Sequence, residues 1–531
     1  MTSKKHLFAG IAGTAVLLAG CTSDPGDVDE SAAGSDDQGE VAGGDNFVMA
    51  VSSDIDTLDP HFATDVPSSQ VTTNIYETLV EHDENMEVVP ALAESFEIID
   101  DLTWEFNIRE GVTFHDGEPL DAEAVVTSFD RLFDSDELKP RANMFELVED
   151  VIAVDDYTVH FELSEPFASL DDHLTHSAAA IISPQAIEGH DNGDVLLGTE
   201  AYGTGPFQLE HWEQGNAIDL GKNEDYWGDE PQVSTVSFNV VPEQSTRMGM
   251  LDQGEVHFID QIEPANAASV DNINGASLLS QEQLGFQSIA FNTDVEPFDD
   301  PDVRRALAMA IDREAIVEGL YSGYGQVAKG PLSPITFGYS EDTEAIEHDL
   351  DAAADLLAEA GYEDGFSATL YTNDENHSRI QLAEVAQDYF GQIGVDISIE
   401  MMEWGTYLEA MNSGNTEIFI SGWSTVTADA DYAMHPNFHS DNLGSEGNNS
   451  FYVNEEVDEL LDEARRETDD EVREDLYAQA EQIIINDAPQ IFTVHNDYIT
   501  GISDSVDGFV LQNNGIYDFS NVSISGDAGG Y

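Results

Sequence analysis

The sequence contains a single cysteine among 531 residues. A chain with one thiol forms no internal disulfide, so its fold depends on the packed core alone. Basic residues are also scarce, because 16 Lys and Arg stand against 108 Asp and Glu, for a formal net charge of −92. A nucleic-acid partner is not expected, since there is no basic stripe to neutralise phosphates.

Apolar residues are plentiful by comparison. They make up 41% of the chain and include 26 Phe, 17 Tyr and 5 Trp, which predicts a globular protein of several domains. Self-repulsion on this scale destabilises a compact state in dilute buffer, whereas molar salt shortens the screening length to about 3 Å. The composition therefore predicts an extreme halophile. In such a chain a carboxylate is by default a surface residue, and an arginine carries more information.

The lone cysteine, Cys21, follows a short apolar run, Leu7–Leu18, with a basic start. The run is shorter than the roughly 20 residues that span a bilayer, so residues 1–20 are predicted to be a signal peptide. Leu18-Ala19-Gly20-Cys21 resembles the lipobox of lipoproteins, which implies that Cys21 carries a lipid and anchors the exported protein to the outer face of the cell membrane. Residues 21–45 are predicted to form a disordered acidic tether. An incidental cysteine in an ordinary signal peptide is the alternative.

Apolar periodicity along the chain predicts α/β architecture. Trp104, Phe106 and Ile108 alternate with polar residues as in a strand, and Asp121 is placed to cap a following helix. Further on, a helix over 380–393, a strand over 395–401 and an apolar run over 418–420 follow one another. Ligands bind at the carboxyl ends of strands in such folds, so the segment SGWSTVTADADYAMHP after Ile420 is a favoured binding position.

Four co-linear blocks resemble one family. The segment ESFEIIDDLTWEFNIREGVTFHDGEPLDAEAVVTSFDR (94–131) is similar to the signature of family 5 extracellular solute-binding proteins, and residues 203–231, 291–316 and 355–366 resemble further family blocks. The members are receptors of ABC importers for dipeptides, oligopeptides, nickel or glutathione. The resemblance implies a binding protein without enzymatic activity or cofactor. The chain also has no H-E-x-x-H, G-x-S-x-G or Walker motif.

The resemblance also implies an architecture. The expected fold is the two-lobed type II venus flytrap of periplasmic binding proteins, with an extra α/β domain. The first lobe is expected to comprise 46–84, 199–284 and 490–531, the extra domain 85–198, and the second lobe 285–489. A solute enclosed between the lobes shifts the population toward the closed form, which docks on the membrane permease. A monomer is expected.

The same resemblance places the ligand at Gly422, Trp423 and Ser424, whose aromatic ring and backbone are expected to contact it. Many peptide receptors have an aspartate three residues after this Trp, where it holds the ligand ammonium. This chain has Val426 there, which leaves Asp429 and Asp431 as candidate replacements. The loop is closer to the glutathione-type subgroup, so the predicted ligand is a di- or oligopeptide or a glutathione-like peptide. A nickel or metal-chelate receptor is the alternative.

Arg379 stands just inside the start of the predicted helix whose apolar positions run from Ile380 to Ile393. A helix N-terminus favours anions, and a guanidinium there adds bidentate recognition of a carboxylate. Arg379 is therefore a candidate for the ligand carboxylate, with a surface salt bridge as the alternative.

Two other patterns carry no predicted function. His435 and His439 are spaced to share a metal on a helix, but Pro436 argues against a regular helix starting before it, so no metal site is expected. Arg466 and Arg473 each follow an aspartate by four residues, Asp462 and Asp469, and are predicted to form ordinary helix ion pairs.

Overall fold

The computed structural model describes residues 46–134, 139–374, 376–444 and 447–525. These residues belong to one compact unit, Val41–Tyr531. Cys21, the predicted signal peptide and the tether up to residue 45 lie outside the described residues. Within the described ranges, no helix combines the length and the apolar character needed to cross a bilayer.

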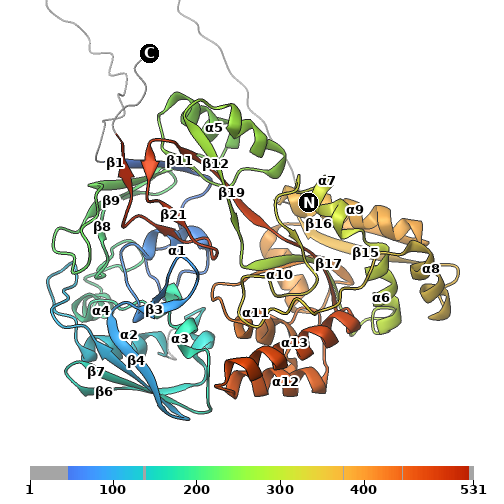
Figure 1. Ribbon diagram of the computed structural model, residues 1–531, viewed down its shortest axis with the longest axis horizontal. Helices are drawn as coiled ribbons and strands as arrows, with labels where there is room; N and C mark the ends of the chain where they lie inside the picture. The colour runs from blue at the N-terminus through green and yellow to red at the C-terminus, as the bar shows by residue number, and fades with distance from the viewer. Residues whose placement is uncertain (1–45, 135–138, 375, 445–446, 526–531) are drawn as a thin grey trace, which may run out of the picture. The chain divides into compact units, whose positions relative to one another are not determined.

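Two large sheets, each covered by helices, confirm the predicted α/β class (Figure 1). The seven-stranded sheet has the order β12 (Ala276–Glu282), β19 (Asp497–Ser503), β11 (Phe258–Ile259), β1 (Asn46–Val51), β10 (Thr235–Val240), β9 (Ala217–Lys222) and β8 (Phe207–Glu213). The six-stranded sheet has the order β14 (Gln326–Val327), β18 (Gln490–His495), β13 (Gly285–Phe291), β17 (Ile418–Ser424), β15 (Phe366–Asn373) and β16 (Val395–Met402).

The helices around these sheets alternate with the strands along the chain. With the seven-stranded sheet go α1 (Val66–Thr72), α5 (Gln244–Gln253) and the 3₁₀ segment η3 (Pro264–Asn272). With the six-stranded sheet go α6 (Pro301–Ala310), α7 (Arg313–Gly319), α8 (Leu350–Glu359), α9 (His377–Gln392), α10 (Trp404–Asn412), α11 (Ala430–Phe438), α12 (Glu455–Arg466) and α13 (Asp470–Asp487). The predicted helix–strand unit over 380–401 is confirmed by α9 and β16.

A smaller antiparallel sheet forms the expected extra domain. Its order is β4 (Ala93–Asp100), β5 (Thr103–Ile108), β7 (Thr158–Leu163) and β6 (Val148–Asp155), and it is accompanied by α2 (Ala122–Leu132), η1 (Ala142–Phe145), α3 (Leu170–His173) and η2 (Ser177–Ala179). Helix α4 (Pro184–Asp191) follows, and its buried residues pack in the core of the seven-stranded sheet. Trp104, Phe106 and Ile108 face its core, and Asp121 caps α2 by accepting a hydrogen bond from the Ala124 amide at 3.0 Å, as predicted.

Short ladders complete the fold. They are β2 (Val80–His82) with β3 (Val88–Pro90), β20 (Val506–Asp507) with β23 (Ser523–Ile524), and β21 (Val510–Leu511) with β22 (Tyr517–Asp518).

The chain passes between the two large sheets at two adjacent points. β12 ends at Glu282 and β13 begins at Gly285, while β18 ends at His495 and β19 begins at Asp497. The Gln283 amide donates to the Asn496 carbonyl at 3.0 Å, so the two crossings are hydrogen-bonded to each other. A pair of short crossings of this kind fits a hinge between two halves.

Sheet membership corrects two of the expected boundaries. β18 lies in the six-stranded sheet, so the return to the first lobe comes at Asn496 and not at residue 490. Residues 180–197 also differ, because Ile182, Ile187 and Leu197 pack in the core of the seven-stranded sheet. Residues 180–198 therefore go with the first lobe. Strand pairing decides the first boundary and core packing the second, since no linker-like segment marks either one.

Candidate functional site

A cavity of about 640 Å³ lies where the two large sheets and the small domain meet. Most of its wall comes from α1, the segment after α1, and the C-terminal strands β21 and β22. The six-stranded sheet contributes Ser424 and Val426, and the small domain contributes Thr175, His176 and Ser177. Its size suits a small organic solute, whose surface such clefts enclose.

The cavity wall is acidic. Six carboxylates line it, and the one arginine among the lining residues is Arg141; the acids are Asp65, Glu77, Glu81, Asp83, Glu84 and Asp518. Burial raises the pKa of Glu77 to about 7, although hydrogen bonds from Trp227 and Tyr226 act in the opposite direction. Glu81 is exposed at the cavity wall, and its pKa is also raised to about 7, by the lower hydration there and by the nearby Glu77 and Asp518. The two side chains repel each other, and a bound cation relieves that repulsion.

Strand β17 presents a free backbone edge beside the cavity. On one side it pairs with β13 along its whole length, from Ile418 to Ser424. On the other side β15 accompanies it only as far as Phe419, so in the described residues no strand pairs with Gly422–Ser424 along that edge. Unpaired backbone groups at a sheet edge can accept an added extended chain.

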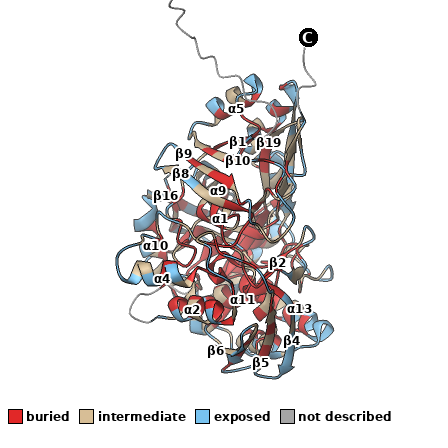
Figure 2. Ribbon diagram, turned by 90° about the vertical axis from the view of Figure 1, so that its left-hand side faces the viewer, coloured by how far each residue is buried: buried red, intermediate tan, exposed pale blue. Residues whose placement is uncertain are grey.

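Trp423 has a structural role that the sequence did not reveal. Helix α11 runs from Ala430 to Phe438 and contains Pro436, so the expectation that this proline prevents a helix was wrong. A proline inside a helix leaves the carbonyl four residues earlier without its donor, which here is the carbonyl of Tyr432. The indole Nε1 of Trp423 donates to that carbonyl at 3.1 Å. The side chain of Trp423 thereby stabilises a helix that is buried nearly throughout (Figure 2).

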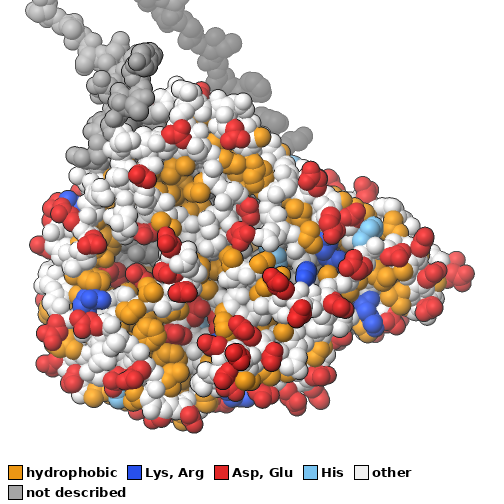
Figure 3. Space-filling view, viewed as in Figure 1, with side chains coloured by type: hydrophobic (Ala, Val, Ile, Leu, Met, Phe, Trp, Pro, Cys, Tyr) orange, Lys and Arg blue, Asp and Glu red, His pale blue; other side chains and the backbone are white. Residues whose placement is uncertain are grey.

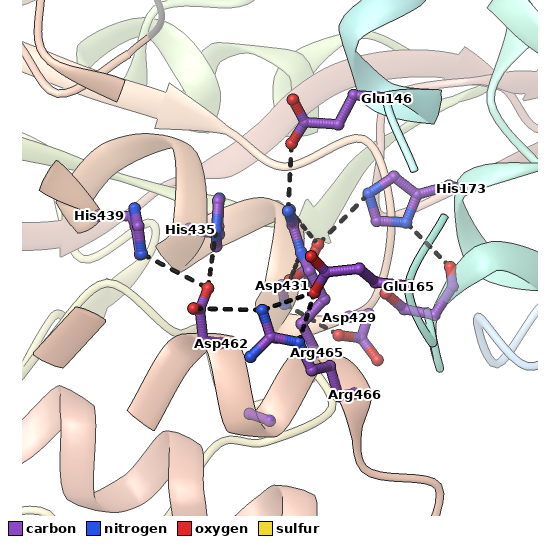
Figure 4. A network of polar contacts seen from close by, with 12 residues as sticks. Glu146, Glu165, His173, Asp429, Asp431, His435, His439, Asp462, Arg465 and Arg466 are labelled. Carbon is purple, nitrogen blue, oxygen red and sulfur yellow. Dashed lines mark hydrogen bonds and ion pairs between the residues drawn. The ribbon is translucent and has the colours of Figure 1, made fainter. Parts of the chain in front are cut away.

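Asp429 and Asp431, the candidate ammonium ligands, both lie in buried ion pairs, of which Figure 4 shows that of Asp431 with Arg465. Nη2 of Arg473 lies 2.8 and 3.0 Å from the two oxygens of Asp429. Arg465 holds Asp431 with two parallel hydrogen bonds of 2.9 and 3.0 Å. Neither aspartate lines the cavity among the described residues. Ligand contact by these two side chains stays a prediction, and their observed partners argue for a structural role.

The two aspartates differ in their electrostatics. Burial raises the pKa of Asp429 to about 6, and Arg473 opposes the rise. Burial acts on Asp431 in the same direction, but Arg465 outweighs it and holds the pKa of that carboxyl well below its usual range. Asp429 also caps α11, because its Oδ1 accepts from the Asp431 amide at 2.8 Å.

His435, His439 and Asp462 place their ligand atoms within 4.8 Å of one another. The two imidazole rings stack with centroids 4.5 Å apart, and Figure 4 shows both facing Asp462. Nδ1 of His439 accepts from the Asp441 amide at 3.1 Å, and Nδ1 of His435 accepts from Asn442 at 3.1 Å. In a neutral ring this puts the proton on Nε2, the atom that faces Asp462. A metal needs a lone pair there, so the arrangement suits hydrogen bonding to Asp462 and not metal ligation.

Arg379 lies at the start of α9, as predicted. Its amide donates to the Asn376 side chain that caps the helix, at 3.0 Å. Its guanidinium carbon is 5.7 Å from the centre of the Trp404 ring, its Nε has no hydrogen-bond partner among the described residues, and burial lowers its pKa. Arg379 is not one of the residues that line the cavity.

The sequence missed the arginine partners that matter most. Arg473 does not pair with Asp469, because Asp469 caps α13 and accepts from the Val472 amide. Arg473 reaches back to Asp429 instead. Arg466 pairs with Asp462 as predicted, at 3.3 Å, but it also reaches Glu165 in the small domain. The one signal for these ion pairs in the sequence was the scarcity of arginine. A chain with so few cations places several of them beside buried carboxylates.

Comparisons with known proteins identify the family. A model described as bacterial extracellular solute-binding proteins, family 5 Middle, matches residues 87–445. The glutathione-binding protein GsiB of Salmonella paratyphi A is 34% identical over 488 residues, 90% of this chain and 94% of that protein. The Helicobacter pylori periplasmic binding protein DppA in complex with peptide STSA matches with a TM-score of 0.79 at 30% identity, over 90% of this chain and 98% of that one.

A more distant structure shares the fold. NikZ from Campylobacter jejuni, in complex with Ni(L-His), matches with a TM-score of 0.78 at 23% identity, over 90% of this chain and 97% of that one. The family consists of substrate-binding receptors of ABC importers, which are not enzymes, and its members have the two-lobed type II fold. The chain described here belongs to family 5 of the extracellular solute-binding proteins.

Proposed function

We propose that this receptor captures a peptide with a free ammonium group in the cavity between its lobes and delivers it to an ABC permease. The single observation that carries the proposal is the cavity itself, which has an acidic wall beside an unpaired strand edge. The relatives support it, since one is a glutathione-binding protein and another was solved with a bound peptide.

The strand edge supplies the backbone part of recognition. Gly422, Trp423 and Ser424 carry the unpaired groups, and Ser424 lines the cavity directly. An extended peptide added along this edge satisfies its own backbone donors and acceptors, whatever its side chains. Trp423 is then a residue that holds the edge and α11 in place, as well as a predicted contact.

The charged ends of the peptide need opposite partners. Because Asp429 and Asp431 are occupied by arginines, the ammonium is assigned to the cavity carboxylates, with Glu81 the foremost candidate. Arg379 remains the proposed partner of a ligand carboxylate, since no described carboxylate forms an ion pair with it and a guanidinium suits that group. An acidic wall favours peptides with a net positive charge over anionic glutathione-like ones.

The location of the receptor is part of the same proposal. A lipid on Cys21 and the tether that follows would hold a monomeric receptor at the outer face of the cell membrane, next to its permease. Acidic side chains spread over the visible face of the molecule with few basic ones among them (Figure 3), which fits a protein that works in concentrated salt. Changing Cys21 to serine is expected to release the protein from membranes into the medium.

Mass spectrometry of the solute that co-purifies in molar KCl tests the ligand class. A peptide with a free amino terminus is the expected result. A metal or metal chelate, lost on treatment with excess chelator, would instead favour the nickel-type receptor. Recovery of a sugar would refute both.

A further inference from the structure

The small domain meets the second lobe along a polar seam that includes the network of Figure 4. On the small-domain side are Glu146, Glu165, Ala168, Asp172 and His173, and on the second-lobe side are Ala428, Asp431, Arg465 and Arg466. The residues on the two sides lie more than 250 positions apart in the chain. The seam is separate from the cavity lining, but it adjoins it, since Val426 and Thr175 line the cavity close by in sequence.

Three hydrogen bonds of the two arginines cross the seam. Nη1 of Arg465 donates to Glu146 at 3.2 Å, and Nε of Arg466 donates to Glu165 at 2.8 Å. The carbonyl of Arg465 accepts from the Ala168 amide at 2.9 Å. We call the two ion pairs, Arg465–Glu146 and Arg466–Glu165, the catch.

The two ion pairs of the catch can break at a small cost in free energy. The partner that neutralises Arg465 most closely is Asp431, on the same side of the seam, and that carboxylate is 1% exposed. Opening the seam therefore leaves no charge buried without a partner. The glutamates it frees are half-exposed already, at 55% for Glu146 and 51% for Glu165, so they return to water at little cost.

Concentrated salt acts unequally on the charges of the seam. At about 1 M salt the screening length is about 3 Å, which removes the long-range repulsion between two acidic halves and weakens exposed contact pairs to a smaller degree. The two ion pairs of the catch then stand beside one further close charge contact across the seam, from His173 to Asp431 at 3.6 Å.

We propose that the catch populates the closed form of the receptor and sets its affinity without touching the ligand. Arg465 and Arg466 are thus positioning residues for closure. The inference depends on the two-lobed receptor fold and not on the identity of the solute.

The test measures the closed population without any ligand. Cysteines replace two exposed glutamates, Glu97 on the small domain and Glu359 on α8, in a full chain with Cys21→Ser, and spin labels on them report the distance between the halves in 2 M KCl. The catch variants are Glu146→Gln, Glu165→Gln and Arg466→Gln. The matched control is Glu230→Gln, which removes an ion pair with Lys222 inside one lobe, 2.7 Å long.

We expect two distance populations in the parent protein. Each catch variant should lower the ratio of closed to open molecules by about two- to fivefold, the range for pairs of this exposure, and the control should not change it. The double variant Glu165→Gln/Arg466→Gln should open the protein no further than either single change, because both remove the same pair.

Several results would overturn the proposal. A single distance shared by the parent and all variants, or an equal shift in Glu230→Gln, would show that the catch does not govern closure. Additive effects of Glu165→Gln and Arg466→Gln would show that they act separately. Each readout is independent of the peptide ligand, so a non-peptide solute would refute the proposed function and leave this result standing.

Discussion

Two groups of Asp, Arg and His lie at two different joints of the molecule. At the first joint Arg131 on α2 of the small domain reaches Asp59 in the first lobe, with Nη1 3.0 Å from Oδ1, and Nη1 also contacts His61. At the second joint Arg465 holds Asp431, and His173 of the small domain stands 3.6 Å from the same carboxylate. The two joints use the same three residue types, but the ion-paired Asp and Arg are placed differently with respect to each joint.

The difference is where the neutralising pair lies. Asp59 and Arg131 lie on opposite sides of the first joint, and their side chains are 4% and 6% exposed. Separating the small domain from the first lobe would therefore leave two buried charges without partners. Asp431 and Arg465 sit on the same side of the second joint, so that pair survives opening. Breaking a buried pair costs several kcal/mol, whereas losing exposed pairs costs about 1 kcal/mol or less. The charges therefore hold the first joint closed, whereas the second can open without leaving a buried charge unpaired.

Removing the cation of the first joint should have the largest effect. Arg131→Met leaves Asp59 buried without a counter-charge, and we expect the free energy of unfolding to fall by about 3–5 kcal/mol. Chemical denaturation in 2 M KCl measures it. Asp59→Asn combined with Arg131→Met should recover much of the loss, because no unpaired charge then remains. An Arg131→Met protein as stable as the parent would show that the charges do not hold the first joint closed.

Acid should weaken the first joint through His61. Burial and the neighbouring Arg131 lower the pKa of His61 to about 4. Its Nε2 donates to the Ala180 carbonyl and its Nδ1 faces Arg131, so the ring is held neutral. The folded pKa lies below the unfolded value of about 6.5, so this contribution is complete above pH 6.5 and is lost as the pH falls toward 4, by about 3 kcal/mol in all.

The variant His61→Gln tests the contribution of His61 to the pH dependence of stability. It has no titrating ring, so its stability should decline less steeply than that of the parent between pH 6.5 and 4. Denaturation curves at matched salt across that window provide the comparison. Parallel pH profiles for the two proteins would show that His61 is not the group that titrates.

The cavity between the two joints keeps carboxylates that no arginine neutralises closely. Glu81→Gln should weaken binding of a peptide with a free amino terminus by about tenfold, since a hydrogen bond to a charged group is worth about 1.5 kcal/mol or more. Isothermal titration measures the affinity. An N-acetylated version of the same peptide should bind the parent and the variant equally. Equal loss for both peptides would move the ammonium site away from Glu81.

Much of this fold was predictable, because apolar periodicity and capping are local signals. The strand at Trp104, Phe106 and Ile108 and the cap at Asp121 followed from spacing alone. In the segment after Ile420, Ser424 and Val426 line the cavity, and ligand binding by that segment stays a prediction. The family resemblance extended this to the arrangement of lobes.

The remainder depended on contacts that no local pattern encodes. Arg473 takes Asp429, 44 residues away, and not the Asp469 that helix spacing favours, because Asp469 is used as a cap. In the helix through Pro436, Trp423 on a neighbouring strand supplies the donor that the carbonyl of Tyr432 lacks. In both cases the partner is fixed by tertiary packing, so the sequence indicated the residues but not their roles.

The smallest predicted loss of stability is that of Arg466→Gln, and it gives the clearest test of the difference between the two joints. Arg466 is 44% exposed, as is typical of a surface pair, so Arg466→Gln should lower the free energy of unfolding by only about 0.2–1 kcal/mol. Arg305→Gln removes a similarly exposed arginine, 42%, which pairs with Asp302 inside α6. The two variants should unfold alike in denaturant and differ only in the distance across the seam. A large loss of stability in Arg466→Gln alone would mean that the seam is part of the fixed structure, and that closure is governed elsewhere.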